Sequence, residues 1–167
     1  MRLLALDPAL RTSGYALMEK DHGPVRVLDF GVLRNPASAC MTACLVEIHR
    51  GIVDLIDRYQ PELCAVESII FVQNSKTAVV LGAARGCALL AAAQRGLPIY
   101  EYAPKRVKQA VVGRGDAQKA QVCFMVRAIL GLDRTPGNDA ADALAIGLTH
   151  LQMQATPAAL VRAGRHL

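Results

Sequence analysis

The stretch RLLALDPALRTSGYALMEKDHGPVRVLDFGVL, residues 2–33, decides the fold. It contains three apolar segments, at residues 2–6, 13–19 and 25–33. Turn-forming residues, among them Pro8 and Gly23, separate these segments. Short apolar runs between turn residues are typical of β-strands, and strands joined by short turns pair in antiparallel fashion. The sequence therefore predicts an antiparallel meander of three strands at the start of the chain.

Beyond Pro36, segments with helical periodicity alternate with two more short apolar runs. The runs at 62–67 and 99–102 predict a fourth and a fifth strand. Helices are expected at residues 39–59, 76–95, 104–112, 118–130 and 139–152. A meander followed by strands that alternate with helices indicates an α/β protein, with a five-stranded mixed sheet flanked by helices.

Two carboxylates, Asp139 and Asp142, stand three residues apart in the alanine-rich helical segment NDAADALA, residues 138–145. This spacing places both side chains on one face of the helix, where like charges repel. A divalent metal would compensate that repulsion, because hard cations bind carboxylate oxygens. The alternative is a helix start, in which Asn138 caps the helix and the acids interact with its dipole.

Two further acids end predicted strands. Asp7 follows the apolar run at 3–6, and Glu67 follows the run at 63–66. An acid at the end of a buried strand is costly unless it is paired or bound to metal. Each could instead be a solvated turn residue. Four carboxylates that converge around two Mg²⁺ or Mn²⁺ ions would suit phosphodiester hydrolysis, and we expect Asp7 to bridge the two ions.

Basic residues concentrate between positions 105 and 119, although the formal net charge of the whole chain is only +5. The candidate DNA contacts in this segment are Lys105, Arg106, Lys108, Arg114 and Lys119. Asp116 is the only acid among them. Such a concentration suits phosphate contacts. The alternative is an ordinary solvated helix face.

Composition limits the class of protein. A chain of 167 residues forms one domain with a substantial core. The five cysteines contain no CxxC pair, so we expect reduced, mostly buried thiols and no zinc site. We also expect no membrane span, a cytoplasmic protein and a disordered basic tail at residues 155–167 after a domain at 1–154.

The chain resembles the RuvC family of Holliday-junction resolvases, a branch of the ribonuclease H-like superfamily. The resemblance extends to about residue 151 and rests on five motifs in a matching order. They are LALDPALRTSGYAL (4–17), AVES (65–68), LGAARG (81–86), EYAPKRVKQAVVGRG (101–115) and DAADALAIGLTH (139–150).

The resemblance implies a ribonuclease H-like fold and a homodimer that resolves four-way DNA junctions in recombination and repair, together with a RuvA–RuvB motor. It assigns catalysis and metal binding to Asp7, Glu67, Asp139 and Asp142. It also places Lys108 and Lys119 near the scissile strand. His150, eleven residues beyond Asp139, is expected to be structural.

Two positions depart from the family pattern. Ala9 replaces the glycine that usually follows Asp-Pro, and alanine would fit poorly if that turn needs a positive φ. The aromatic residue expected three positions after Glu67 is Ile70 here, with Phe71 next to it. Either side chain could wedge into the junction, or both could belong to the core.

Two other functions stay open at this point. One is a YqgF-type RNA-processing nuclease with the same fold, and the motifs at 81–86 and 107–113 argue against it. The other is a junction-binding protein without activity, and the presence of all four carboxylates argues against that.

Overall fold

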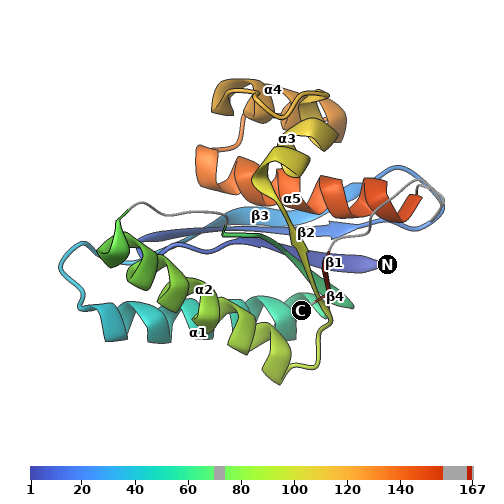
Figure 1. Cartoon of the computed structure of the whole chain (residues 1–167). Coiled ribbons are helices and arrows are strands. Elements are labelled where there is room, and N and C mark those ends of the chain that lie inside the picture. Colours follow the sequence, from blue (N-terminus) through green and yellow to red (C-terminus); the bar gives the residue numbers. More distant parts are fainter. Residues whose placement is uncertain (70–73, 156–164, 167) are drawn as a thin grey trace.

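One mixed β-sheet, with strand order β3-β2-β1-β4-β5-β6, runs through the molecule (Figure 1). The computed structural model describes residues 1–69, 74–155 and 165–166. The strands are β1 (Arg2–Asp7), β2 (Thr12–Glu19), β3 (Arg26–Arg34), β4 (Leu63–Glu67), β5 (Ile99–Tyr102) and β6 (Arg165–His166). Strands β1 to β3 are antiparallel neighbours, whereas β1, β4 and β5 run parallel. The predicted meander and mixed sheet are therefore confirmed.

The sixth strand is a difference from the sequence analysis. It consists of two residues, which pair antiparallel with β5 at Tyr100 and Glu101. Both come from the segment 155–167, for which the sequence predicts disorder, and two residues are too few to give a strand pattern. Residues 156–164 and 167 of that tail lie outside the described part of the chain.

Five helices cover the two faces of the sheet among the described residues. They are α1 (Met41–Tyr59), α2 (Ser75–Gln94), α3 (Pro104–Val112), α4 (Lys119–Leu130) and α5 (Asn138–Ala155). Helices α1 and α2 lie side by side on one face, and α5 lies on the other with α3 and α4 stacked upon it (Figure 1). Each predicted helix is present, with ends within a few residues of the expected positions.

Strand β1 lies at the centre of two hydrophobic cores. Leu3 and Ala5 point into the core beneath α5, whereas Leu4 and Leu6 point into the core beneath α1 and α2. This is the two-residue alternation of a strand that is buried on both faces. It explains why residues 3–6 form a continuous apolar run rather than an alternating one.

Small residues let α5 approach the sheet closely. A Cβ atom placed on Gly147 would lie 2.4 Å from Sδ of Met18 and 3.3 Å from Cβ of Ala5. Helix α5 begins above the carboxyl end of β1 and runs back over the sheet (Figure 1). Its first turn is thereby fixed above the edge where β1 and β4 end.

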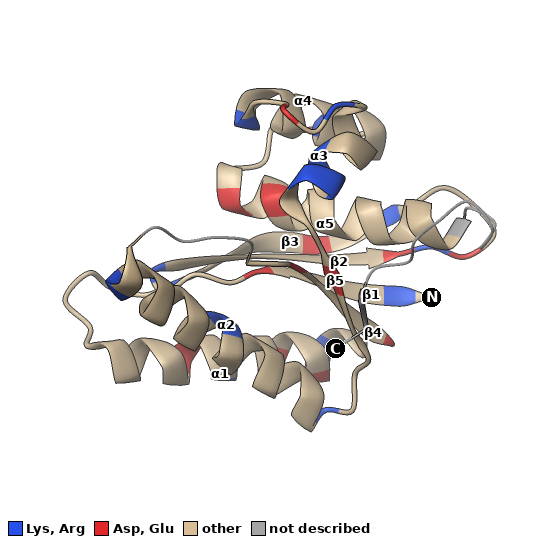
Figure 2. Cartoon of the chain, in the orientation of Figure 1, with Lys and Arg blue, Asp and Glu red and all other residues tan. Residues whose placement is uncertain are grey.

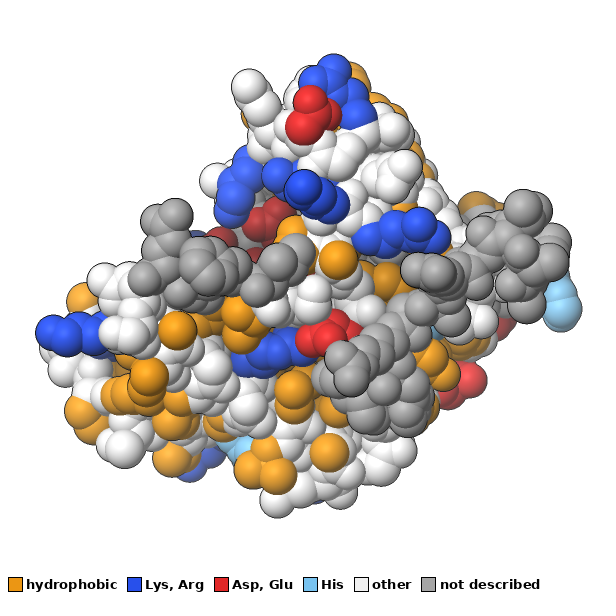
Figure 3. All heavy atoms as spheres, in the orientation of Figure 1, with side chains coloured by type: hydrophobic (Ala, Val, Ile, Leu, Met, Phe, Trp, Pro, Cys, Tyr) orange, Lys and Arg blue, Asp and Glu red, His pale blue; other side chains and the backbone are white. Residues whose placement is uncertain are grey.

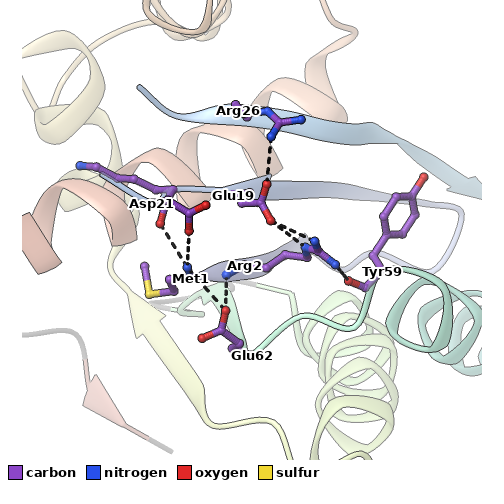
Figure 4. Close-up of polar contacts among 8 residues, drawn as sticks. Met1, Arg2, Glu19, Asp21, Arg26, Tyr59 and Glu62 are labelled. Atoms are coloured by element: carbon purple, nitrogen blue, oxygen red, sulfur yellow. Dashed lines mark hydrogen bonds and ion pairs between the residues drawn. The ribbon is translucent and has the colours of Figure 1, made fainter. Parts of the chain in front are cut away.

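A polar network lies at the opposite end of the central strands, where β1 begins (Figure 4). Arg2 on β1 donates to the carboxylate of Glu19 at 2.9 Å and to the carbonyl of Tyr59 at 2.5 Å. Glu19 also pairs with Arg26 on β3 at 3.4 Å. These contacts join three strands to the end of α1 and involve none of the four candidate acids.

The sequence predicts that no segment could span a membrane, and helix α2 does not fit this prediction. By length and composition alone, it is the one helix of the described chain that is long and apolar enough. A single such helix is weak evidence, because core helices of soluble proteins pass the same test. Arg85, in the middle of α2, is buried and forms an ion pair with Glu101 on β5.

Candidate active site

The parallel pairing of β1 and β4 brings two of the predicted acids together. Leu6 and Val66 are register partners, and each is followed directly by an acid, Asp7 or Glu67. The carboxyl ends of parallel neighbours lie at the same edge of a sheet. Asp7 and Glu67 therefore lie on adjacent strands at one end of the central sheet.

Gly14 brings the acids of α5 to the same place. It is the register partner of Asp7 on β2. A Cβ atom on Gly14 would lie only 2.0 Å from the carbonyl oxygen of Asp139, closer than real Cβ contacts come. The first turn of α5 thus lies against the backbone of β2 beside Asp7. Asp142 follows one turn later on the same helix.

Electrostatic coupling shows that the acids form one cluster. The pKa of Asp7 is raised to about 6, first by burial and then by the charges of Asp142 and Asp139. The pKa of Glu67 is raised to about 7, first by burial and then by the charges of Asp7 and Asp142. Asp142 acts on both strand-end acids and Asp139 acts on Asp7, so the side chains of the cluster face a shared space.

Lysines provide the opposing charge. The ammonium of Lys119, at the start of α4, lies 3.2 Å from Oδ2 of Asp142, and the charge of Asp142 raises the pKa of Lys119. Lys108 on α3 lowers the pKa of Glu67. Figure 2 shows basic residues on α3 and acidic residues at the start of α5, and Figure 3 shows acidic side chains in a hollow below basic ones.

The donor set suits a hard divalent cation, since four carboxylates surround one space and two of them, Asp7 and Glu67, have raised pKa values. In their present positions, no three Asp, Glu, His or Cys side chains of the described chain come close enough to hold an ion. Asp142 is engaged by Lys119 instead. Binding an ion would therefore require that ion pair to open or to rearrange.

The remaining basic residues are less closely connected to the acids. Arg114 pairs with Asp116 at 3.0 Å on the surface, and one guanidinium nitrogen of Arg106 lies 3.4 Å from Sδ of Met153. Lys105 is exposed near the start of α3. All three belong to the layer above the site. Ile70 and Phe71, the candidate wedge residues, lie outside the described residues.

The buried cysteines and His150 have the roles of packed side chains, apart from the acids. The five cysteines are free, and three of them, Cys44, Cys64 and Cys123, are buried. His150 is buried and bonded through Nδ1 to the hydroxyl of Tyr102 at 2.8 Å, and burial lowers its pKa to about 4. A neutral, packed histidine agrees with the structural role expected for it.

The turn after Asp7 accepts alanine. Gln60 is the one non-glycine residue with a positive φ in the described chain, so Ala9 needs no glycine-like backbone. The N–H of Ala9 donates to Oγ of Ser13 at 3.1 Å, and that hydroxyl donates to the carbonyl of Ala9 at 2.7 Å. Buried Ser13 therefore closes the turn in place of a special backbone conformation.

Two residues of this region were not predicted from the sequence, Gly14 and Arg85. The close approach at Gly14 depends on how α5 packs, which no local pattern reveals. Arg85 donates to the backbone carbonyl of Glu67 at 2.5 Å. Its position inside an apolar helix is the one sequence signal that could have drawn attention to it, because an unpaired buried arginine is rare.

A central strand ending in an acid, a parallel neighbour ending in a second acid and a helix bearing two more define a ribonuclease H-like fold. The crystal structure of the yeast mitochondrial Holliday junction resolvase Ydc2 shares this fold, with a TM-score of 0.66 at 14% identity, over 92% of this chain and 79% of that one.

Closer relatives identify the family. The family model for the crossover junction endodeoxyribonuclease RuvC matches residues 3–150. RuvC of Akkermansia muciniphila is 55% identical over 151 residues, which are 90% of each chain. A structure of T. thermophilus RuvC in complex with Holliday junction substrate has a TM-score of 0.86 at 30% identity and covers both chains fully. The chain therefore belongs to the RuvC family of crossover junction endodeoxyribonucleases, which are DNA-cleaving hydrolases.

Proposed function

We propose that this chain resolves four-way DNA junctions, and that Asp7, Glu67, Asp139 and Asp142 form its catalytic centre. The observation that carries the proposal is the convergence of four carboxylates from β1, β4 and α5, where burial and the charges of neighbouring acids raise the pKa values of Asp7 and Glu67. The T. thermophilus complex with its junction supports the choice of substrate. Residues 1–154 would be the nuclease domain.

The same four carboxylates would hold two divalent ions, Mg²⁺ or Mn²⁺. Asp7 suits a shared position, because both helical acids act on its pKa. When bound, the ions supply Lewis-acid stabilisation of charge on the phosphate and on the attacking water. Family membership supports a divalent metal in general, and the all-oxygen donor set favours these two ions.

The protein side chains have separate tasks in this mechanism. Glu67 would hold an ion beside Asp7, and its pKa of about 7 means that ion binding near neutral pH releases a proton from it. Lys119 can leave Asp142 and contact a phosphate oxygen, since both are anionic partners at the surface. Lys108, Lys105, Arg106 and Arg114 would hold the flanking strands through phosphate contacts.

The proposed assembly is a cytoplasmic homodimer that works with a RuvA–RuvB branch-migration complex. Two symmetric cuts require two active sites, and a two-fold dimer supplies them. The outer face of α2 is the candidate surface for the dimer. Val79 and Leu90 are 68% and 53% exposed there, and the positions of Gly82 and Gly86 on the same face are open.

The test is cleavage of a mobile four-way junction with Mg²⁺ or Mn²⁺, with products mapped to the nucleotide. Asp7→Asn keeps the shape of the side chain but removes its charge. It should abolish cleavage and retain junction binding, which can improve because a negative charge facing DNA is gone. Asp57→Asn, on α1, is the control with an acid outside the site. Full cleavage by Asp7→Asn would refute the proposed centre.

The same experiment separates the alternatives. Cleavage of RNA in preference to the junction would favour a YqgF-type enzyme. Junction binding without cleavage by the unaltered chain, at any metal concentration, would favour a non-catalytic binding protein.

A further inference from the structure

Arg85 lies where the strand that carries Glu67 ends. Its side chain is only 10% exposed, although it belongs to a helix whose other face is open to solvent. One guanidinium nitrogen donates to the carbonyl oxygen of Glu67 at 2.5 Å. A second nitrogen binds the carboxylate of Glu101, which is itself only 18% exposed.

The peptide unit between Glu67 and Ser68 is thereby held at both ends. Its carbonyl accepts from Arg85, and its N–H donates to the carbonyl of Tyr102 on β5 at 2.8 Å. This unit is bonded to the Cα atom of Glu67, so its orientation determines where the carboxylate points. Beyond Glu67 the strand pairing stops, and the guanidinium provides a hydrogen bond where no further strand residue does.

Glu101 fixes the guanidinium in turn. It is the register partner of Val66 on β5, one residue before the Glu67–Tyr102 pair. A planar guanidinium can bond a carbonyl and a carboxylate at the same time, which the single ammonium of lysine cannot do in the same geometry. The ends of β4 and β5 and the middle of α2 are therefore joined through one side chain.

We propose that Arg85 is a positioning residue for Glu67, which sets the direction of that carboxylate toward the metal and the substrate. The inference rests on the proposed catalytic role of Glu67. On this proposal, the buried pair of Arg85 and Glu101 contributes to catalysis as well as to the stability of the fold. Residues that orient metal-binding side chains commonly affect metal affinity or activity by about 10- to 100-fold.

The main test replaces both charges together. Arg85→Met alone leaves Glu101 buried without a partner and destabilises the fold. The double variant Arg85→Met/Glu101→Leu removes both charges, so the melting temperature should return toward that of the unaltered protein. Its single-turnover cleavage of a junction should still fall by about 10- to 100-fold, and half-maximal cleavage should need more metal. Junction binding in EDTA should stay within about twofold, because no phosphate contact is removed.

Two further variants complete the design. Arg85→Lys keeps a charge beside Glu101 but cannot serve both partners, so it should melt almost normally and cleave at an intermediate rate. Arg95→Met removes the ion pair with Asp57 on α1 at the residue that follows the end of α2. It should leave the rate and the metal requirement unchanged.

The outcomes distinguish a failure of this proposal from a failure of the proposed catalytic centre. If Glu67→Gln is inactive while the double variant cleaves normally with the usual metal requirement, Arg85 has only a structural role. If Glu67→Gln itself cleaves normally, the proposed centre is wrong and the role of Arg85 fails with it. Should the double variant not fold, normal cleavage and metal requirement in Arg85→Lys would overturn the inference instead.

Discussion

The carboxyl groups of Asp7 and Glu67 are chemically the same as those of exposed acids, but ionising them costs more free energy. Both are half-buried, and each has neighbouring acids that carry the same charge. A cluster of this kind works against folding when it is ionised without a counter-ion. The site is therefore a place where the protein gives up stability for chemistry.

A first prediction concerns stability and pH in the absence of metal. The pKa of Glu67 is raised to about 7 in the folded chain, so the folded state holds a proton that the unfolded state has released. The stability that this proton contributes is full at low pH and is lost as the pH rises through 7. Glu67→Gln, which stays uncharged, should therefore melt roughly 2–4 °C higher at pH 8, the shift expected for about 1 kcal/mol.

The difference should vanish near pH 4, where the acid of the unaltered protein is protonated too. Thermal melts in EDTA at both pH values measure it. Glu47→Gln, on the surface of α1, is the control and should change little at either pH. A Glu67→Gln protein that is less stable at pH 8 than the unaltered chain would contradict the prediction.

A second prediction concerns Lys119. Lys119→Ala removes the ion pair with Asp142 and a candidate phosphate contact. Single-turnover cleavage at saturating enzyme should fall, and the salt dependence of junction binding should weaken by about one unit of slope. Lys105→Ala, from the same basic layer, should alter binding but not the rate at saturation. Equal effects of the two variants on the rate would show that Lys119 has no special position.

The four acids could be predicted from the sequence because each stands in a local pattern that makes a charge unexpected. Gly14 and Arg85 could not, because their roles depend on which distant backbone lies against them.

The start of α5 at Asn138 differs from the sequence interpretation. The sequence allows this residue to cap the last helix, but α5 already includes Asn138, and its first internal bond runs from Ala141 to the carbonyl of Gly137.

At the scale of elements, the packing of α5 on β2 sets the geometry of the site. Elements with strong periodicity, such as α1 and the meander strands, agree closely with the sequence prediction. The two-residue β6 does not, because so short a strand has no pattern of its own and exists only through its pairing with β5. The distance of α5 from the sheet was equally hidden, since it depends on residues without side chains.

A third prediction follows from that packing. Gly14→Ala would place a methyl group within 2.0 Å of the carbonyl oxygen of Asp139, so the start of α5 must move away. Stability should fall by about 1–3 kcal/mol, as overpacking does, and cleavage should fall with it because Asp139 and Asp142 move too. Gly23→Ala is the matched control, since no atom lies within 4 Å of its added carbon. Denaturant unfolding and junction cleavage would be measured for both variants.

At the scale of the whole molecule, the two faces of the sheet have different tasks. Helices α3, α4 and α5 cover one face and surround the acids with basic residues (Figure 2). Helices α1 and α2 cover the other face and expose apolar side chains, including Val46, Val79 and Leu90. The face with the acids and basic residues thus suits DNA, and the outer face of α2 is the surface proposed for a second copy of the protein.

A fourth prediction tests the second surface. Leu90→Glu places a charge on the outer face of α2 and should convert a dimer to monomers in sedimentation or light scattering. The monomer should nick single strands of a junction but lose the paired cuts, because only one active site is present. Ile129→Glu, which alters an exposed apolar residue on α4, should stay dimeric. A Leu90→Glu protein that remains dimeric would exclude this face of α2.

The late position of α5 in the chain has a consequence for synthesis. Translation releases β1 and β4 long before residues 138–155, so a growing chain can present Asp7 and Glu67 but lacks Asp139 and Asp142. The central sheet also pairs segments that are about sixty positions apart, which slows its formation. If the four acids form the catalytic centre as proposed, cleavage requires that α5 has left the ribosome and packed on the sheet.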